Sequence, residues 1–218
     1  MKKVLITGGT GGIGKAIVDN LQDNFKVITV ARSNADICGD LTDIKFRDFL
    51  VESIMPDIFI NNAGRLYYDQ YKMLDINGTS AVDLLYKFYD KMPCGTIINI
   101  SSISHSKSPQ PKEHLSKITY GIAKKHLREV SIALNNSKSK PLKVMCVSPA
   151  AVDTKMIREL FDYQPKDEDY TNYSWENSIA WMKPKELAEI IRYLIELPQH
   201  IVIPEISIDN HYSKAIYW

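Results

Sequence analysis

The sequence predicts an α/β fold, in which a doubly wound, mostly parallel sheet of seven strands carries helices on both faces. Short apolar runs typical of buried strands recur along the chain, and helical stretches separate most of them. The first run leads directly into a glycine-rich turn and a helix over 13–21. With 218 residues the chain has the length of one such domain, so we expect a single domain over 1–218. The predicted strands cover 4–6, 26–31, 36–41, 57–60, 96–100, 143–147 and 200–208.

The turn after the first strand contains five glycines within TGGTGGIG, residues 7–14. Glycines permit positive φ and let a ligand approach the backbone closely. The helix that follows offers unpaired N–H groups and a partial positive charge, which suit a pyrophosphate. The turn therefore predicts a dinucleotide site in a Rossmann-type unit, and the alternative is a tight turn without a ligand. Two glycine spacings, 8/12/14 and 8/11/14, both fit dinucleotide patterns.

The end of the second strand bears on which dinucleotide binds. Arg32 follows this strand directly, and no acidic residue stands at its end. An arginine at this place accommodates the 2′-phosphate of NADP, whereas an acid binds the ribose of NAD. We therefore favour NADP. Asp36 and Asp40 lie near the spacing of an NAD-type acid, so NAD stays open.

Three further segments are informative. The sequence NNAG, residues 61–64, ends the fourth strand, where its amides can tie loops together and its small residues leave room for a nucleoside, although a plain turn is the alternative. Thr42 is the expected cap of a helix reaching Ile54. A helical region over 69–91 contains Asn77-Gly78, which predicts a helix break or a local distortion that frees a backbone carbonyl.

Tyr120 and Lys124 lie four residues apart in a helix predicted to run to about Leu134, so both point to one side. A neighbouring ammonium stabilises a phenolate and lowers the pKa of the phenol, which makes tyrosine a usable proton donor to a carbonyl. A hydroxyl from Ser102, after the fifth strand, could hold that carbonyl. The same spacing in Tyr68–Lys72 is interpreted as a solvated helix face.

Six segments occur in one order: TGGTGGIG, NNAG, ING, INISS, YGIAK and SPAAVDT. Together they resemble the short-chain dehydrogenase/reductase family, in its single-domain branch with TGxxxGxG spacing, over residues 1–154. The resemblance implies an NAD(P)-dependent oxidoreductase. It implies that Tyr120 is the acid/base, that Lys124 lowers its pKa and binds the nicotinamide ribose, and that Ser102 orients the carbonyl. It also implies that the main-chain carbonyl of Asn77 holds a relay water.

The resemblance also implies a set of cofactor contacts. The pyrophosphate turn, the adenine end, the ribose and the nicotinamide loop would involve Gly8, Thr10, Gly11, Gly12, Ile13, Gly14, Arg32, Asp40, Leu41, Asn61, Ala63, Gly64, Pro149, Val152 and Thr154, besides Tyr120 and Lys124. Two features depart from the family pattern. Ala150 replaces the usual glycine after Pro149, which would cost stability if that backbone needs positive φ, and the loop over 103–119 is long.

The aromatic-rich segment at about 155–183 corresponds to the family's substrate-covering region, and a surface helix packed on the core is an equal alternative. The expected substrate is a small carbonyl or alcohol, of ketone, aldehyde or 3-oxoacyl type. The family resemblance also suggests a homodimer or homotetramer. A dinucleotide-binding sensor or scaffold with little turnover is the competing function.

Composition excludes several other classes. The net charge is +1 without a basic stripe, so we expect neither nucleic acid nor a membrane surface as partner. No apolar stretch approaches the length of a membrane span. Three scattered cysteines indicate reduced thiols in a cytoplasmic protein, and the five histidines show no metal-ligand spacing, so no metal is expected.

Overall fold

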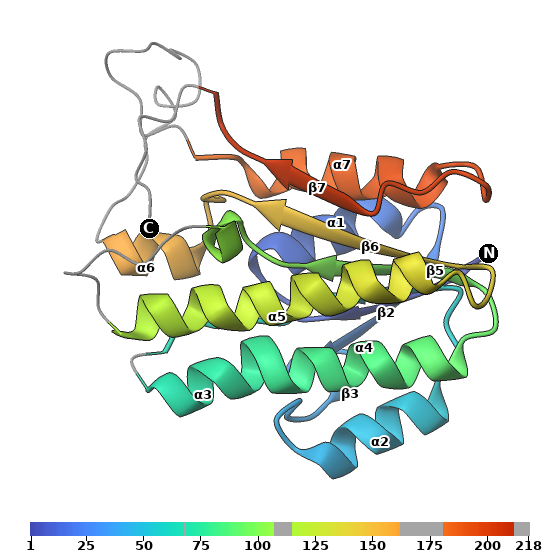
Figure 1. Cartoon of the computed structure of the whole chain (residues 1–218), viewed down its shortest axis with the longest axis horizontal. Coiled ribbons are helices and arrows are strands. Elements are labelled where there is room, and N and C mark those ends of the chain that lie inside the picture. The colour runs from blue at the N-terminus through green and yellow to red at the C-terminus, as the bar shows by residue number, and fades with distance from the viewer. Residues whose placement is uncertain (68, 107–114, 162–180, 212–218) are drawn as a thin grey trace.

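The computed structural model describes residues 1–67, 69–106, 115–161 and 181–211, and one parallel seven-stranded sheet forms its centre (Figure 1). The strand order is β3-β2-β1-β4-β5-β6-β7, and every pairing is parallel. The predicted doubly wound sheet is therefore confirmed. The strands are β1 (Lys3–Thr7), β2 (Lys26–Ala31), β3 (Ile37–Cys38), β4 (Ile58–Asn61), β5 (Gly95–Ile100), β6 (Leu142–Pro149) and β7 (Glu205–Ile208).

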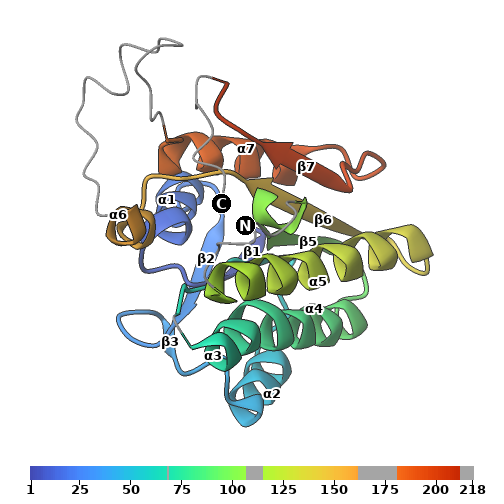
Figure 2. The same ribbon diagram turned by 60° about the vertical axis from the view of Figure 1, so that its left-hand side comes forward.

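Helices cover both faces of this sheet (Figures 1 and 2). One apolar cluster, with Ile17 and Ile191, packs α1 and α7 on one face, and another, with Phe88 and Leu127, packs α4 and α5 on the other. The helices are α1 (Gly12–Leu21), α2 (Ile44–Ser53), α3 (Gln70–Leu74), the π-helix η1 (Asp75–Thr79), α4 (Ser80–Lys91), the 3₁₀-helix η2 (Ile103–Ser106), α5 (Leu115–Ser137), α6 (Lys155–Phe161) and α7 (Pro184–Glu196).

The order of the strands determines where a ligand can bind. The chain builds outwards from β1 through β2 to β3, then crosses back so that β4 lies on the other side of β1. The direction of winding reverses between these two central strands. Loops leaving their carboxyl ends therefore separate and leave a crevice, which is where open α/β sheets bind ligands.

Of the two alternatives for the long helical region, a helix break or a local distortion, the structure shows the distortion. Asn77 and Gly78 lie in η1, a π-helical turn between α3 and α4. A Cβ added to Gly78 would stand 3.3 Å from the Ala123 Cβ, so the glycine lets η1 approach α5. Asp69 caps the start of this region, accepting hydrogen bonds from the Tyr71 and Lys72 amides. The distortion thus sits where this helical region packs against the helix that carries Tyr120.

Several boundaries differ from expectation. The cap of α2 is Asp43, whose carboxylate accepts from the Lys45 amide at 2.9 Å, because the Thr42 hydroxyl already donates to Asp40 at 2.8 Å. The strands β3 and β7 are shorter than predicted. Helix α5 begins at Leu115, so Tyr120 lies in its second turn. No helix in the described ranges is long and apolar enough to cross a bilayer.

Candidate active site

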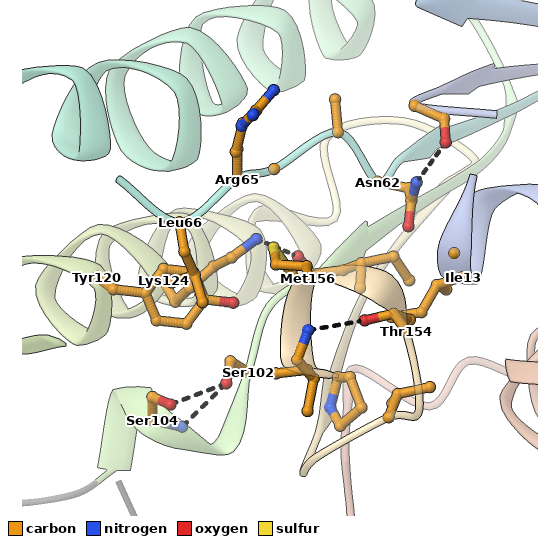
Figure 3. A pocket seen from close by; sticks show the side chains of 18 of the residues that line it. Ile13, Asn62, Arg65, Leu66, Ser102, Ser104, Tyr120, Lys124, Thr154 and Met156 are labelled. Carbon is orange, nitrogen blue, oxygen red and sulfur yellow. Dashed lines mark hydrogen bonds between the residues drawn. The ribbon is translucent and has the colours of Figure 1, made fainter. Parts of the chain in front are cut away.

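A cavity of about 610 Å³ opens at the carboxyl ends of the central strands. It is bordered by the glycine turn after β1, the NNAG segment after β4, the serines after β5 and the loop after β6. Tyr120 in the second turn of α5 and Lys124 one turn later also line its wall (Figure 3). Segments that are far apart in the sequence thus meet at the crevice that the strand order creates.

The glycine turn forms a cradle in which side chains have no room. Gly8 and Gly12 adopt φ of +70° and +51°, which favour glycine. A Cβ on Gly14 would overlap the Gly8 carbonyl oxygen. Gly11 instead has φ of −159°, an extended conformation open to any residue, and nothing stands within 4 Å of its missing Cβ. The backbone therefore requires the spacing of Gly8, Gly12 and Gly14.

This cradle fits a dinucleotide pyrophosphate. Gly11 is the N-cap of α1, and no side chain caps this helix end. Its first-turn N–H groups consequently lack the usual side-chain acceptor and can bind an anion. Gly11, Gly12, Ile13 and Gly14 all line the cavity. Thr10, which was also predicted to contact the cofactor, does not line it.

The two asparagine side chains of the NNAG segment make different contacts. Asn61 is buried, and its amide donates to the Ala81 carbonyl and to Asn99, so its side chain points away from the cavity. Asn62 lines the cavity and donates to the Thr7 carbonyl at 2.9 Å. The Asn61 side chain therefore does not line the cavity, whereas the neighbouring Asn62, absent from our predicted set, does. The contact of Asn61 with the cofactor stays a prediction. Ala63 and Gly64 line the cavity as expected.

At the end of β2, Arg32 is exposed and lines the cavity. The Asp36 carboxylate accepts hydrogen bonds from the Thr29 amide at 2.8 Å and the Thr29 hydroxyl at 2.7 Å, which lower its pKa. The Asp40 carboxylate is likewise bonded to the Thr42 amide and hydroxyl, and these bonds and the nearby Arg32 charge lower its pKa. The carboxylates of both candidate NAD-type acids are thus engaged in hydrogen bonds with nearby threonines.

Asp40 and Leu41 do not line the cavity, and their predicted place beside the adenine stays a prediction. Leu41 packs in the apolar core, and its carbonyl accepts from Arg47 at 2.7 Å. Arg47 also reaches Asp83 on α4. The turn after β3 is therefore attached to α2 and α4 rather than to the cavity wall.

The three predicted catalytic side chains, Ser102, Tyr120 and Lys124, all line the cavity (Figure 3). The Lys124 ammonium donates to the Ile100 carbonyl at 2.8 Å and lies 5.8 Å from the centroid of the Tyr120 ring. Ser101 donates to the Lys124 carbonyl at 2.9 Å, which fastens α5 to the end of β5. The serine loop and the tyrosine helix are thus joined directly beneath the site.

Burial dominates the protonation of this group. It raises the pKa of Tyr120 to about 12, although a hydrogen bond from Ser102 acts in the opposite direction. Burial also lowers the pKa of Lys124 to about 8. The expected lowering of the tyrosine pKa by the lysine is not present in this arrangement, because the ammonium is held by Ile100 and desolvation is the larger effect.

Asn77 does not line the cavity but fixes one of its walls. Its buried amide donates to the Arg65 carbonyl at 2.6 Å and to the Met73 carbonyl at 3.0 Å, and its oxygen accepts from the Arg65 amide at 3.1 Å. A Cβ on Gly64 would stand 2.8 Å from that oxygen. The side chain thus clamps the backbone after NNAG. The water-relay role of its own carbonyl stays a prediction.

The loop after β6 brings Pro149, Val152 and Thr154 to the cavity, and their contact with the cofactor stays a prediction. Ala150 has no positive φ, since the only such non-glycine residues in the described ranges are Asn34 and Lys138. Its amide donates to the Ile208 carbonyl at 2.8 Å. The replacement of the family's glycine by alanine therefore causes no backbone strain.

Several lining residues were missed by sequence reasoning. Besides Asn62 they include Arg65, Leu66, Tyr67, Met73, Ile103, Ser104, Met156 and Ile157. Leu66 and Met156 point towards Tyr120 and Lys124 (Figure 3), and only the position of Leu66, two residues after NNAG, could have signalled such a role. Within the described ranges, no group of three or more His, Cys, Asp or Glu side chains could hold a metal. Tyr68 and most of the predicted substrate-covering segment, 162–180, lie outside the described residues.

The buried lysine has a testable consequence for stability. Its pKa of about 8 is below the ordinary 10.5, so between these values the unfolded chain holds a proton that the folded protein has released. The free energy of unfolding should therefore rise with pH across this window through Lys124. We expect the stability of Lys124→Met relative to wild type to be greatest below pH 8 and to fall towards pH 10.5, as measured by urea unfolding. Lys125→Met, which removes an exposed lysine from the same helix, is the matched control, and an identical pH trend in the two variants would contradict the assignment.

Comparison with known proteins gives a consistent result. A model of the family described as short chain dehydrogenase matches residues 2–165, well over half of the chain. Dehydrogenase/reductase SDR family member 11 of Homo sapiens is 28% identical over 251 residues, covering 93% of this chain and 92% of the relative. The closed form of serine dehydrogenase complexed with NADP+ has a TM-score of 0.76 at 23% identity and 94% coverage of both chains. The 3-alpha-hydroxysteroid dehydrogenase from Pseudomonas sp. B-0831 complexed with NADH has a TM-score of 0.75 at 18% identity and 95% coverage of both. The chain therefore belongs to the short-chain dehydrogenase/reductase family of oxidoreductases.

Proposed function

We propose that the protein is an NADPH-dependent reductase of a small carbonyl compound of ketone, aldehyde or 3-oxoacyl type. The observation that carries this proposal is the convergence of Ser102, Tyr120 and Lys124 on one cavity that also contains the glycine cradle. A proton donor, a carbonyl-orienting hydroxyl and an anion site on one wall are the parts that hydride transfer to a carbonyl requires.

Each residue has a distinct task in this proposal. The nicotinamide, when bound, supplies the hydride. Tyr120 donates the proton to the carbonyl oxygen, and with a pKa of about 12 it is protonated at neutral pH. Ser102 donates a hydrogen bond to the same oxygen. The Lys124 ammonium, which Ile100 holds 5.8 Å from the centroid of the Tyr120 ring, binds the cofactor ribose.

The preference for NADP rests on the end of β2. Arg32 faces the cavity, while the Asp36 and Asp40 carboxylates are bonded to Thr29 and Thr42. A guanidinium at the cavity, near carboxylates that are already bonded to threonines, is suited to a 2′-phosphate. Similar structures hold NADP+ in serine dehydrogenase and NADH in the hydroxysteroid dehydrogenase, so the choice follows from this chain's own residues. Assembly as a homodimer or homotetramer stays a prediction.

The proposal is tested by oxidation of NADPH in the presence of a panel of ketones, aldehydes, quinones and 3-oxoacyl thioesters, with NADH in parallel. Consumption of NADPH that depends on one of these carbonyls supports the reductase. Tight NADPH binding with no consumption across the panel would instead support the sensor or scaffold. The Tyr120–Lys124 pair in the cavity favours the enzyme, because a binding protein does not need it.

Arg32→Ala tests the cofactor preference. Loss of a charge-assisted bond to the 2′-phosphate should weaken NADPH binding by about tenfold to a hundredfold. NADH lacks that phosphate and serves as the internal control, with nearly unchanged affinity. Arg32→Lys keeps the charge but loses the planar fork, so it should fall between wild type and alanine. Titration of cofactor fluorescence measures all three, and equal losses for NADPH and NADH would remove the phosphate role.

A further inference from the structure

The hydroxyl of Ser102 is bonded to a second serine. Its Oγ donates to the Ser104 Oγ at 3.0 Å and accepts from the Ser104 amide at 3.2 Å (Figure 3). Ser104 lies in η2 and lines the same cavity as Tyr120. A hydroxyl outside the predicted catalytic set is therefore in direct contact with the group proposed to orient the substrate.

The position of Ser104 is fixed by its neighbours on both sides. A Cβ on Gly121 would stand 2.9 Å from the Ser104 carbonyl oxygen, so the glycine after Tyr120 lets η2 pack against α5. The next residue, His105, has a side chain only 7% exposed and lies 3.7 Å from the Glu205 carboxylate of β7. Arg128 of α5 pairs with the same carboxylate. The η2 turn is thus held against both α5 and the last strand.

The single proton of the Ser102 hydroxyl limits the hydrogen bonds that Ser102 can donate. A serine hydroxyl has one proton and accepts through two lone pairs. In this structure the Ser102 hydroxyl donates to the Ser104 oxygen and also interacts with the Tyr120 phenol, while the Ser104 amide occupies one of its lone pairs. To donate to a substrate carbonyl, Ser102 must release the Ser104 oxygen, and the Ser104 hydroxyl can then rotate to donate to Ser102. A chain of two hydroxyls polarises its terminal donor, because hydrogen bonds in series strengthen one another.

We propose that Ser104 is a positioning residue that sets the direction of the Ser102 proton and, with substrate bound, donates to Ser102 while Ser102 donates to the carbonyl oxygen. The inference rests on the proposed reductase function. Ser104 itself touches neither the carbonyl nor the cofactor in this arrangement, and no bond is made or broken at it.

The kinetic test compares Ser104→Ala, Ser104→Thr, Ser102→Ala and the double variant Ser102→Ala/Ser104→Ala in the presence of saturating NADPH. Ser104→Ala should lower kcat by about two- to tenfold, the effect of one neutral hydrogen bond, with little change in the carbonyl KM. Ser104→Thr retains the hydroxyl and should restore most of the rate. In the Ser102→Ala background the second substitution should have no further effect, because its target is gone.

Ser106→Ala is the matched control, since Ser106 is in the same 3₁₀-helix but is exposed, bonded to the Ile103 carbonyl and absent from the cavity wall. Urea unfolding of the same variants gives a readout that needs no turnover. Ser102 and Ser104 should be non-additive in stability, whereas Ser102 and Ser106 should be additive.

The results of these experiments distinguish the positioning role of Ser104 from the proposed reductase function. Additive losses of kcat from positions 102 and 104, a faster Ser104→Ala enzyme or additive stabilities would each overturn the positioning role in an otherwise active reductase. A wild-type protein that reduces no member of the carbonyl panel would overturn the proposed function and the catalytic role of Ser104 with it, while the stability cycle would still show whether the two hydroxyls are coupled.

Discussion

Replacing Tyr120 with phenylalanine is expected to lower kcat by at least about a hundredfold, the lower end of what a positioned proton donor contributes. The variant removes one oxygen and keeps the ring, so the walls of the cavity should keep their shape. NADPH affinity should be nearly unchanged, since the glycine cradle and Arg32 lie elsewhere on the cavity wall. Single-turnover reduction and fluorescence titration of NADPH measure these two quantities separately.

Stability helps to interpret this variant. Burial disfavours the charged form of Tyr120, so phenylalanine should leave the free energy of unfolding near the wild-type value. Tyr193→Phe makes the same chemical change on α7 at a side chain that is 60% exposed and outside the cavity. It should retain full turnover. Undiminished kcat in Tyr120→Phe would show that another group delivers the proton.

Much of the architecture could be predicted from the sequence because strand signals in a parallel sheet are strong. A strand buried on both faces must be apolar throughout, as Val4, Leu5 and Ile6 are, and such runs are easily distinguished from the helices between them. The predicted lengths of the two edge strands of the sheet, β3 and β7, were less accurate. The strand β3 has only two residues, since Asp36 is bonded to Thr29 rather than extending the ladder. Polar side chains at an edge compete with the sheet's own hydrogen bonds.

The candidate site was predictable only as far as motifs identify chemistry. Tyr120, Lys124 and Ser102 have side chains whose reactivity suggests a role, and all three line the cavity. Asn61 and Asn62 are chemically identical, but Asn61, the last residue of β4, directs its amide to Ala81 and Asn99, whereas Asn62, the next residue, lines the cavity. Which of the two faces the ligand depends on strand register, which a pair of asparagines does not specify.

Ser104 and Asn77 show a second limit. Both act on the site through hydrogen bonds to other residues, Ser104 through Ser102 and Asn77 through the Arg65 backbone. These contacts depend on how η2 packs on α5 and how η1 distorts the helical region before α4. A residue whose effect depends on such packing carries no chemical signature of its own. Conversely, the choice between the two glycine spacings needed backbone angles at Gly11 and Gly12.

Gly14→Ala is expected to remove NADPH binding and to lower the melting temperature. Two effects oppose each other at this position, because alanine is better than glycine inside a helix by about 1 kcal/mol. The added Cβ, however, would overlap the Gly8 carbonyl oxygen and stand 2.7 Å from the Asn62 amide nitrogen. Overpacking of this kind costs about 1–3 kcal/mol, and a backbone atom cannot rotate away. The steric cost should therefore exceed the helix gain, and α1 must shift from the glycine turn.

The matched control is Gly11→Ala, three residues earlier in the same turn. Its backbone is extended, with φ of −159°, and its Cβ would meet nothing within 4 Å, so the melting temperature should stay close to wild type. Thermal unfolding and NADPH titration of both variants test this contrast. If Gly14→Ala kept wild-type stability and NADPH affinity, the close contact between Gly14 and Gly8 would not be what holds the helix start against the turn. The assignment of the pyrophosphate to this cradle would then lose its structural basis. An anion can bind there only if the first-turn N–H groups of α1 are held in place, and the contact between Gly14 and Gly8 is what we expect to hold them.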